Sequence, residues 1–317
     1  MKYDNKNIKQ SITEDLKKHY GIIPNFVDFK SVGEESYSYF VIDKNGEKYF
    51  VKYCEKANVI KNIDLVNQLL VQLKDFDFVV PPIGVKGITS FDVLSGKIYV
   101  YPFIDGEILT IGNEKFDKPL VDSLLEIMVK IHFSKDRITV DLPVESFDND
   151  FLSDFEKLFA LLAKSEERKD GEALSFLESN EVVIRSLISN HTKSGEHFKN
   201  NKPIFVLTHG DITGRNIIMA KDSLKLVDWD GAMITPAERD LNFLLDNPHF
   251  LVQEYLKKMG FKNYDPKLEE YYGQQWALGS IIGNLENLLT MDLTPEDYAE
   301  YLGEAKKYLG YYQEKAL

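Results

Sequence analysis

Two aspartates and one asparagine stand at positions where they could catalyse the transfer of a phosphoryl group. Asp211 and Asn216 belong to one loop, and Asp228 ends the next apolar run. Transfer of the γ-phosphoryl group of ATP needs one carboxylate to orient the attacking hydroxyl. It also needs an amide oxygen and a second carboxylate to hold magnesium. These residue types in this order predict a small-molecule kinase, with Asp211 in the first role and Asn216 and Asp228 as metal ligands.

The spacing of the apolar residues should bring the two predicted metal ligands together. The apolar runs 217–219 and 224–227 flank a turn-rich break, which predicts a β-hairpin. Residues at equal distance from a hairpin turn face each other, so Asn216 should lie opposite Val227 or Asp228. Oxygen ligands suit Mg²⁺, a hard cation that keeps several waters and bridges substrate phosphates.

A structural reading competes with the catalytic one. An Asp or Asn at a strand end is more often a turn or capping residue than a ligand. For any one of the three residues alone that reading would be preferred, but their order and spacing together favour chemistry. His209, two residues before Asp211, is expected to brace the loop by hydrogen bonds and not to titrate during catalysis.

The composition is that of an ordinary soluble globular protein. The 317 residues suffice for about two domains or lobes, each with its own core. The single cysteine, Cys54, excludes an intrachain disulfide framework and suggests a reducing compartment. The N-terminus has no apolar signal core, and no apolar run approaches the roughly 20 residues of a membrane span, so a cytoplasmic protein is expected. The net charge of −13 argues against nucleic acid or an anionic membrane as a partner and would tolerate a cationic substrate.

Residues 1–104 are predicted to form a small, sheet-rich lobe. An amphipathic helix, Ile8–His19, ends at Gly21, and helical spacing from Val59 to Leu73 predicts a second helix. Short apolar runs bounded by turn residues predict five strands: Phe26–Val32, Ser38–Ile42, Lys48–Tyr53, Phe91–Leu94 and Lys97–Tyr101.

Residues 105–317 are predicted to form a larger, mostly helical lobe, which makes the fold class α+β. The segment Tyr101–Gly106 leaves the last strand and should link the two lobes. The catalytic hairpin, within 204–230, interrupts a series of helices: Leu120–His132, Asp150–Ala163, Leu174–Ile188, Phe250–Met259, Pro266–Leu289 and Pro295–Tyr312.

Lys52 and Ser36 are candidates for binding the nucleotide phosphates. Lys52 alternates with Val51 along its strand and shares a face with Phe50, so it could reach over a nucleotide and pair with the α- and β-phosphates. A lone lysine on a strand is more often simply exposed to solvent. Here, however, the order strand, loop, strand, strand favours a role in phosphate binding. The Ser36 hydroxyl and the backbone of loop 33–37 could close over the phosphates, although a plain hairpin turn would look similar.

These residues together resemble a known family. His209-Gly210-Asp211 with Asn216, Asp228-Trp229-Asp230 and the run 236–241 look like the aminoglycoside phosphotransferase and choline kinase family. The resemblance extends over most of the chain, and 226–241 look most like the spectinomycin phosphotransferase branch.

The resemblance implies a two-lobed, protein-kinase-like fold and transfer of the ATP γ-phosphoryl group to a hydroxyl of a small molecule. It implies that Asp211 is the catalytic base, that Asn216 and Asp228 bind magnesium, and that Lys52 binds phosphate. It also implies that adenine lies against the Pro102 C=O and the Ile104 N–H, and that Asp240 is a buried structural carboxylate. We expect no nucleic-acid or membrane partner, and the oligomeric state stays open.

The sequence departs from the family pattern beside Lys52 and Asn216. The family normally pairs the lysine with a glutamate on the following helix, whereas here only Asp64 or Glu55 could substitute. Arg215 stands where a small residue is common, and it could either touch the γ-phosphate or pack outward.

A third departure concerns the acceptor. Gln274-Gln275-Trp276 and Gly279-Ser280 stand where antibiotic-modifying relatives often present carboxylates to cationic substrates. Four aromatic residues of this region, at helical spacing, are expected to be core more than acceptor pocket: Tyr264, Tyr271, Tyr272 and Trp276.

Three functions therefore compete. The first is an ATP-dependent kinase of an aminoglycoside-type antibiotic, with a role in antibiotic resistance. The second is a housekeeping kinase of choline, an amino alcohol or a sugar. The third is a nucleotide-binding relative without catalysis, against which the intact Asp211, Asn216 and Asp228 argue. A protein kinase is disfavoured because the Arg before the catalytic Asp and an Ala-Pro-Glu segment are both missing.

Overall fold

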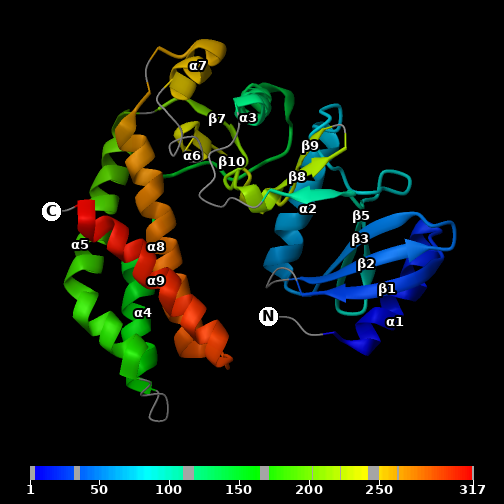
Figure 1. Ribbon diagram of the computed structural model, residues 1–317, viewed down its shortest axis with the longest axis horizontal. Helices are drawn as coiled ribbons and strands as arrows, with labels where there is room; N and C mark the ends of the chain where they lie inside the picture. The colour runs from blue at the N-terminus through cyan, green and yellow to red at the C-terminus, as the bar shows by residue number, and fades with distance from the viewer. Residues whose placement is uncertain are drawn as a thin grey trace.

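The computed structural model of the chain describes residues 4–31, 36–109, 118–164, 171–201, 203–221, 223–241, 250–262 and 264–315. An N-terminal part built on an antiparallel sheet stands beside a C-terminal part of long helices, with the short strands of the predicted catalytic hairpin between them (Figure 1). The α+β, two-lobed organisation predicted from the sequence is confirmed. The lobe boundary at residue 104 stays a prediction.

The N-terminal part contains a five-stranded antiparallel sheet in the order β1-β2-β3-β5-β4. The five predicted strands are all present, and only their ends differ: β1 (Pro24–Lys30), β2 (Tyr37–Asp43), β3 (Lys48–Cys54), β4 (Ser90–Val93) and β5 (Gly96–Pro102). Val32, the predicted end of the first strand, lies outside the described residues.

Side-chain alternation gives this sheet two covered faces. On one face Val51 and Tyr53 pack with Ile12 of α1 (Lys6–Asp15), which continues into the π-helix η1 (Leu16–Tyr20). On the other face Tyr99 packs with Ile63 of α2 (Ala57–Gln72). Because side chains alternate along a strand, Lys52 lies on the α2 face, opposite Val51 and Tyr53. The sequence predicted this alternation but not which helix covers each face.

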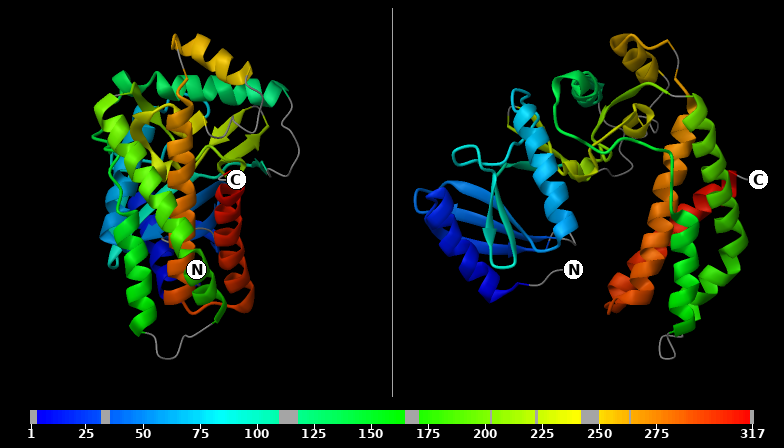
Figure 2. Two further views of the ribbon diagram at one scale, coloured as in Figure 1. Left: turned by 90° about the vertical axis from the view of Figure 1, so that its left-hand side faces the viewer. Right: turned by 180° about the vertical axis from the view of Figure 1, so that it is seen from behind.

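Long helices dominate the C-terminal part. In Figure 2 four of them, α4, α5, α8 and α9, run together as a bundle on the side away from the sheet. The helices are α3 (Lys118–His132), η2 (Lys135–Arg137), α4 (Phe151–Lys164), α5 (Gly171–Asn201), α6 (Glu238–Leu241), α7 (Phe250–Met259), α8 (Pro266–Thr290) and α9 (Pro295–Lys315).

The predicted end of α5 at Ile188 is wrong, because the helix continues without interruption to Asn201. The residues after Ile188 are mostly polar, so the sequence shows no clear helical period there. His191, Gly195 and Phe198 are nevertheless buried along one side of the helix. Gly195 is required there, since a Cβ would lie 2.5 Å from the Phe147 C=O.

Two small sheets hold the predicted catalytic segment. The hairpin of β8 (Ile217–Ala220) and β9 (Leu224–Leu226) forms as predicted, and β6 (Gly106–Ile108), directly after the linker, adds a third strand beside β8. A second pair joins β7 (Phe205–Thr208) to β10 (Met233–Pro236). Strands β6, β7 and β10 were not predicted from the sequence.

Candidate active site

The hairpin places Asn216 and Asp228 at its open end. Ile217 pairs with Leu226, and the Val227 N–H donates to the Asn216 C=O at 2.9 Å. Asn216 therefore lies opposite Val227, one of the two positions predicted, and Asp228 is the next residue along the chain.

Asp228 turns the chain out of β9. Its backbone is left-handed, with φ 63° and ψ 59°, and it starts the 3₁₀ turn η4 (Trp229–Gly231). Asp tolerates this conformation better than a branched residue does. Trp229 anchors the turn, because its ring is buried and its Nε1–H donates to the Leu226 C=O at 3.1 Å. The carboxylate of Asp228 is left 53% exposed.

Asp211 and Asn216 are joined directly. The Asn216 Nδ2 donates to the Asp211 Oδ2 at 2.8 Å and to the Asp211 C=O at 3.0 Å. Burial raises the pKa of Asp211 and the nearby charge of Asp228 adds to this, whereas the Asn216 hydrogen bond and His209 oppose it. Asn216 thus fixes the carboxylate in one orientation.

The donor set fits magnesium bound jointly with phosphates. Because the Asn216 nitrogen is committed to Asp211, its Oδ1 is the atom that could bind a cation. The exposed Asp228 carboxylate lies at the same end of the hairpin. Mg²⁺ commonly takes only one or two carboxylates plus substrate phosphates. Within the described ranges no group of three or more His, Cys, Asp or Glu could hold a metal.

Lys52 faces the same place from the sheet. Its Nζ lies 3.9 Å from the Asp228 Oδ1. Neither candidate substitute for the family's glutamate contacts it among the described residues: Asp64 pairs with Lys97 at 2.7 Å, and Glu55 accepts hydrogen bonds from two hydroxyl groups. The contact of Lys52 therefore comes from the segment after the hairpin and not from α2.

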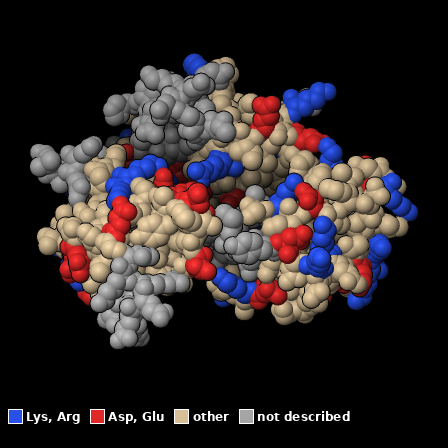
Figure 3. Space-filling model, turned by 60° about the horizontal axis from the view of Figure 1, so that its bottom comes forward, with Lys and Arg blue, Asp and Glu red and all other residues tan. Residues whose placement is uncertain are grey.

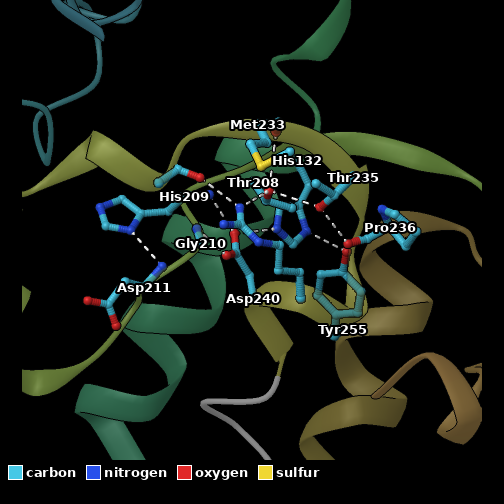
Figure 4. A network of polar contacts seen from close by, with 12 residues as sticks. His132, Thr208, His209, Gly210, Asp211, Met233, Thr235, Pro236, Asp240 and Tyr255 are labelled. Carbon is cyan, nitrogen blue, oxygen red and sulfur yellow. Dashed lines mark hydrogen bonds and ion pairs between the residues drawn. The ribbon is translucent and has the colours of Figure 1, made fainter. Parts of the chain in front are cut away.

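A buried carboxylate holds the loop that precedes Asp211. The Asp240 Oδ1 accepts from the Gly210 N–H at 2.7 Å, and its Oδ2 accepts from the His209 N–H at 2.8 Å. The Oδ2 also contacts the His132 Nε2 at 3.1 Å (Figure 4). Burial alone would raise the pKa of Asp240, but the contacts with His132 and His209 outweigh it and hold that pKa below its usual range. Asp240 is thus the buried structural carboxylate that the resemblance implied.

His209 braces the loop by hydrogen bonds, as predicted. Its Nδ1 accepts from the Asp211 N–H at 3.2 Å, so its Nε2 is the donor to the Val227 C=O at 3.1 Å. Burial lowers the pKa of His209, which keeps the ring neutral in this arrangement. One imidazole therefore ties the residue before Asp228 to the backbone of Asp211.

The predicted adenine contacts lie apart from these residues. The Phe103 N–H donates to the Lys48 C=O at 3.2 Å, so the Pro102 C=O and the Ile104 N–H face away from β3. Pro102 and Ile104 line a cavity of about 420 Å³ with the hairpin tip. Lys52 is not among the lining residues of that cavity.

The remaining predicted residues are less closely tied to the site. Ser36 is buried before β2, and no hydrogen bond of Ser36 is seen in the described part of the chain. Of its predicted loop, 33–37, residues 33–35 lie outside the described residues. Arg215 is exposed. Tyr271 and Tyr272 are core residues as predicted, but Trp276 is 49% exposed, so its assignment to the core is wrong.

Three further residues near the site, His132, Tyr255 and Arg239, were not predicted from the sequence. His132 ends α3 and contacts Asp240, and the hydroxyl of Tyr255 on α7 lies 2.6 Å from the His132 Nδ1. Tertiary packing alone brings these two residues to the site. Arg239 contacts Gly231 and Thr208. Its position beside Asp240 was the one signal available in the sequence.

Figure 3 shows a hollow between the sheet side and the helical side, with acidic and basic side chains both on its rim. Such a hollow could admit a small molecule. No described helix is both long and apolar enough to cross a bilayer.

Comparison with known proteins identifies the family to which this chain belongs. A family model described as the phosphotransferase enzyme family matches residues 30–280. The chain belongs to this phosphotransferase family. A comparison with curated proteins found no match.

Solved structures of similar fold include three enzymes. The spectinomycin phosphotransferase APH(9)-Ia, in complex with ADP and spectinomycin, has a TM-score of 0.75 at 21% identity over 94% of this chain and 93% of that chain. The GDP and kanamycin complex of APH(2")-IIia has a TM-score of 0.63 at 17% identity over 96% and 99%. The choline kinase LicA from Streptococcus pneumoniae has a TM-score of 0.59 at 16% identity over 96% and 99%. At these identities the likeness concerns the fold.

Proposed function

We propose that this chain is an ATP-dependent kinase that phosphorylates a hydroxyl of a small molecule. The observation that carries the proposal is the convergence of Asp211, Asn216, Asp228 and Lys52. The Asn216 amide fixes the Asp211 carboxylate at 2.8 Å, and Lys52 lies 3.9 Å from Asp228. Nucleotide use is supported by the ADP, AMP and GDP complexes among proteins of similar fold.

In the proposed reaction Asp211 orients the acceptor hydroxyl toward the γ-phosphorus. A bond forms between the acceptor oxygen and that phosphorus, and the bond to the bridging oxygen of ADP breaks. The hydroxyl proton passes to the Asp211 carboxylate. The raised pKa of Asp211 suits a group that must hold a proton briefly.

The other residues position the nucleotide. Lys52 binds the α- and β-phosphates, and the linker backbone at Pro102 and Ile104 contacts adenine. Magnesium, held by Asn216 and Asp228, would neutralise phosphate charge as it develops. Ser36 is proposed to add a hydroxyl contact to the phosphates.

An aminoglycoside-type antibiotic is the first candidate for the acceptor. The spectinomycin and kanamycin complexes support it because both are held by proteins of this fold. A metabolite is the second candidate. The choline kinase of similar fold supports choline, and the neutral stretch Gln274-Gln275-Trp276 favours an uncharged acceptor such as a sugar. A binding-only relative is disfavoured, because the residue types needed for transfer are all present, Asn216 is hydrogen-bonded to Asp211, and Lys52 lies 3.9 Å from Asp228.

A panel experiment separates these acceptors. The purified protein is incubated with ATP, Mg²⁺ and spectinomycin, several aminoglycosides, choline, amino alcohols and sugars, and products are followed by mass spectrometry. A gain of one phosphoryl group on an antibiotic supports the first candidate, and a gain on a metabolite supports the second. ATP binding without any product over the panel would count against the kinase proposal.

A further inference from the structure

Arg239 bridges two segments that carry different parts of the proposed site. Its half-buried side chain extends from α6, and its Nη1 donates to the Gly231 C=O at 2.7 Å and to the Thr208 Oγ1 at 3.2 Å. Thr208 ends β7 three residues before Asp211, and Gly231 lies three residues after Asp228. One guanidinium therefore joins the segment of the catalytic carboxylate to the segment of the metal ligand.

The guanidinium also covers the residue next to Asp211. A Cβ at Gly210 would lie 2.4 Å from the Arg239 Nη1 and 2.6 Å from its Cζ and Nη2. Three atoms at nearly equal distance mean that the face of the guanidinium, and not one tip, packs on the Gly210 α-carbon. Gly210 has φ 91°, a conformation that other residues rarely adopt. Glycine is therefore needed here both for the backbone and for the arginine.

Arg239 and Asp240 hold the same loop from two sides. Asp240 accepts the backbone N–H groups of His209 and Gly210, whereas Arg239 covers the α-carbon of Gly210. A Cβ at Gly231 would lie 3.5 Å from the Arg239 Nη2 and 3.8 Å from the Gly210 Cα, so the two glycines approach each other beside the guanidinium. Arg239 and Asp240 together therefore hold the backbone of His209 and Gly210 in one position.

We propose that Arg239 is a positioning residue that sets the distance between Asp211 and Asp228 during transfer. The proposal rests on the kinase function proposed above. Arginine suits the role because its planar fork can donate in two directions while its face packs on Gly210. A lysine would present a single point charge and could not cover the glycine.

The expected effect is on the chemical step more than on nucleotide binding. A displacement of about 1 Å in a reacting group can cost roughly 10²-fold in rate. We expect Arg239→Ala and Arg239→Lys to lower kcat by about 10- to 100-fold. The KM for ATP should change less than about twofold, because Lys52 and the linker lie on other elements. The matched control is Arg137→Ala, which removes an exposed arginine of η2 that lies over the Phe76 ring.

Two measurements test the role. The first is transfer to the best acceptor of the panel, with and without added guanidinium at a concentration that leaves the wild type folded. Guanidinium should restore part of the kcat of Arg239→Ala but none of an Asp211→Asn variant. The second is hydrogen exchange of the amides in 208–216 and 228–233, which should speed up together in both Arg239 variants and not in Arg137→Ala.

Wild-type kcat in Arg239→Ala would overturn the proposal. The proposal would also be overturned if Arg239→Ala lost kcat, guanidinium restored none of it, and amide hydrogen exchange in 208–216 and 228–233 stayed unchanged. If the wild type phosphorylates nothing, the kinase function fails instead. The exchange measurement needs no acceptor, so coordinated acceleration in 208–216 and 228–233 would still support the bridge and its absence would refute it.

Discussion

Replacing Asp240 by asparagine should weaken the hydrogen bonds that hold the loop before Asp211, and so destabilise the protein. Three donors point at this carboxylate: the Gly210 N–H at 2.7 Å, the His209 N–H at 2.8 Å and the His132 Nε2 at 3.1 Å. Asparagine has a single acceptor oxygen, so at least one buried donor must lose its partner and face an amide N–H. An unsatisfied buried donor costs about 1–3 kcal/mol, and the remaining bonds lose the assistance of charge. We expect Asp240→Asn to lower the free energy of unfolding by about 3 kcal/mol.

The measurement is urea unfolding followed by Trp fluorescence and circular dichroism. Asp240→Ala, which leaves all three donors without a partner, should cost more, about 4–5 kcal/mol. The control is Asp92→Asn on the exposed face of β4, which should stay within about 0.5 kcal/mol of the wild type. A second signature is pH: because the pKa of Asp240 is lowered in the fold, its contribution is present at neutral pH and is lost as pH falls through that pKa. A loss in Asp240→Asn no larger than in Asp92→Asn would refute this account of the loop.

Three further predictions follow from single contacts. Lys52→Met should lower kcat/KM for ATP by about 10²-fold, because it removes the cation that lies 3.9 Å from Asp228. Steady-state kinetics at varied ATP concentration measures this loss. An unchanged kcat/KM would show that Lys52 does not bind the phosphates. Gly210→Ala should lower the free energy of unfolding by about 2 kcal/mol or more, because alanine would need φ 91° and its Cβ would lie 2.4 Å from the Arg239 Nη1. Thermal unfolding measures this loss. Equal stability of the two proteins would contradict the close approach of Arg239 to Gly210. Burial lowers the pKa of His191 to about 4, so the wild type should lose about 2 kcal/mol between pH 7 and pH 5 that His191→Phe does not lose. Urea midpoints at the two pH values measure that difference, and equal losses in both proteins would show that His191 is not buried as a neutral ring.

The elements with a clear hydrophobic period could be predicted from the sequence. The alternation around Lys52 predicted that it lies on the face opposite Val51 and Tyr53. The apolar runs 217–219 and 224–227 predicted the hairpin with Asn216 opposite Val227 or Asp228, and the structure has Val227 there. The end of α5 was missed because the residues after Ile188 are mostly polar. The low helix propensity of these residues was overridden there by tertiary packing, in which Gly195 lies against the backbone of Phe147.

Contacts between distant segments could not be predicted in the same way. Asp240 meets His132 from a helix that ends far earlier in the chain, and no local pattern marks that pair. The same holds for Arg239 and Gly231, whose approach depends on how α6 packs against the loop. The sequence showed that the usual glutamate beside Lys52 was missing. Only the fold showed that, in the part of the chain that is described, the Asp228 carboxylate lies 3.9 Å from the Lys52 Nζ.

The most direct test of the central claim compares the wild type with Asp211→Asn in phosphoryl transfer. Both proteins are given ATP, Mg²⁺ and the acceptor panel, and ADP and phosphorylated product are quantified by mass spectrometry, with ADP binding measured separately. The account predicts equal amounts of ADP and product from the wild type. It predicts a loss of at least about 10²-fold in Asp211→Asn, with unchanged ADP affinity. Undiminished transfer by Asp211→Asn would contradict it.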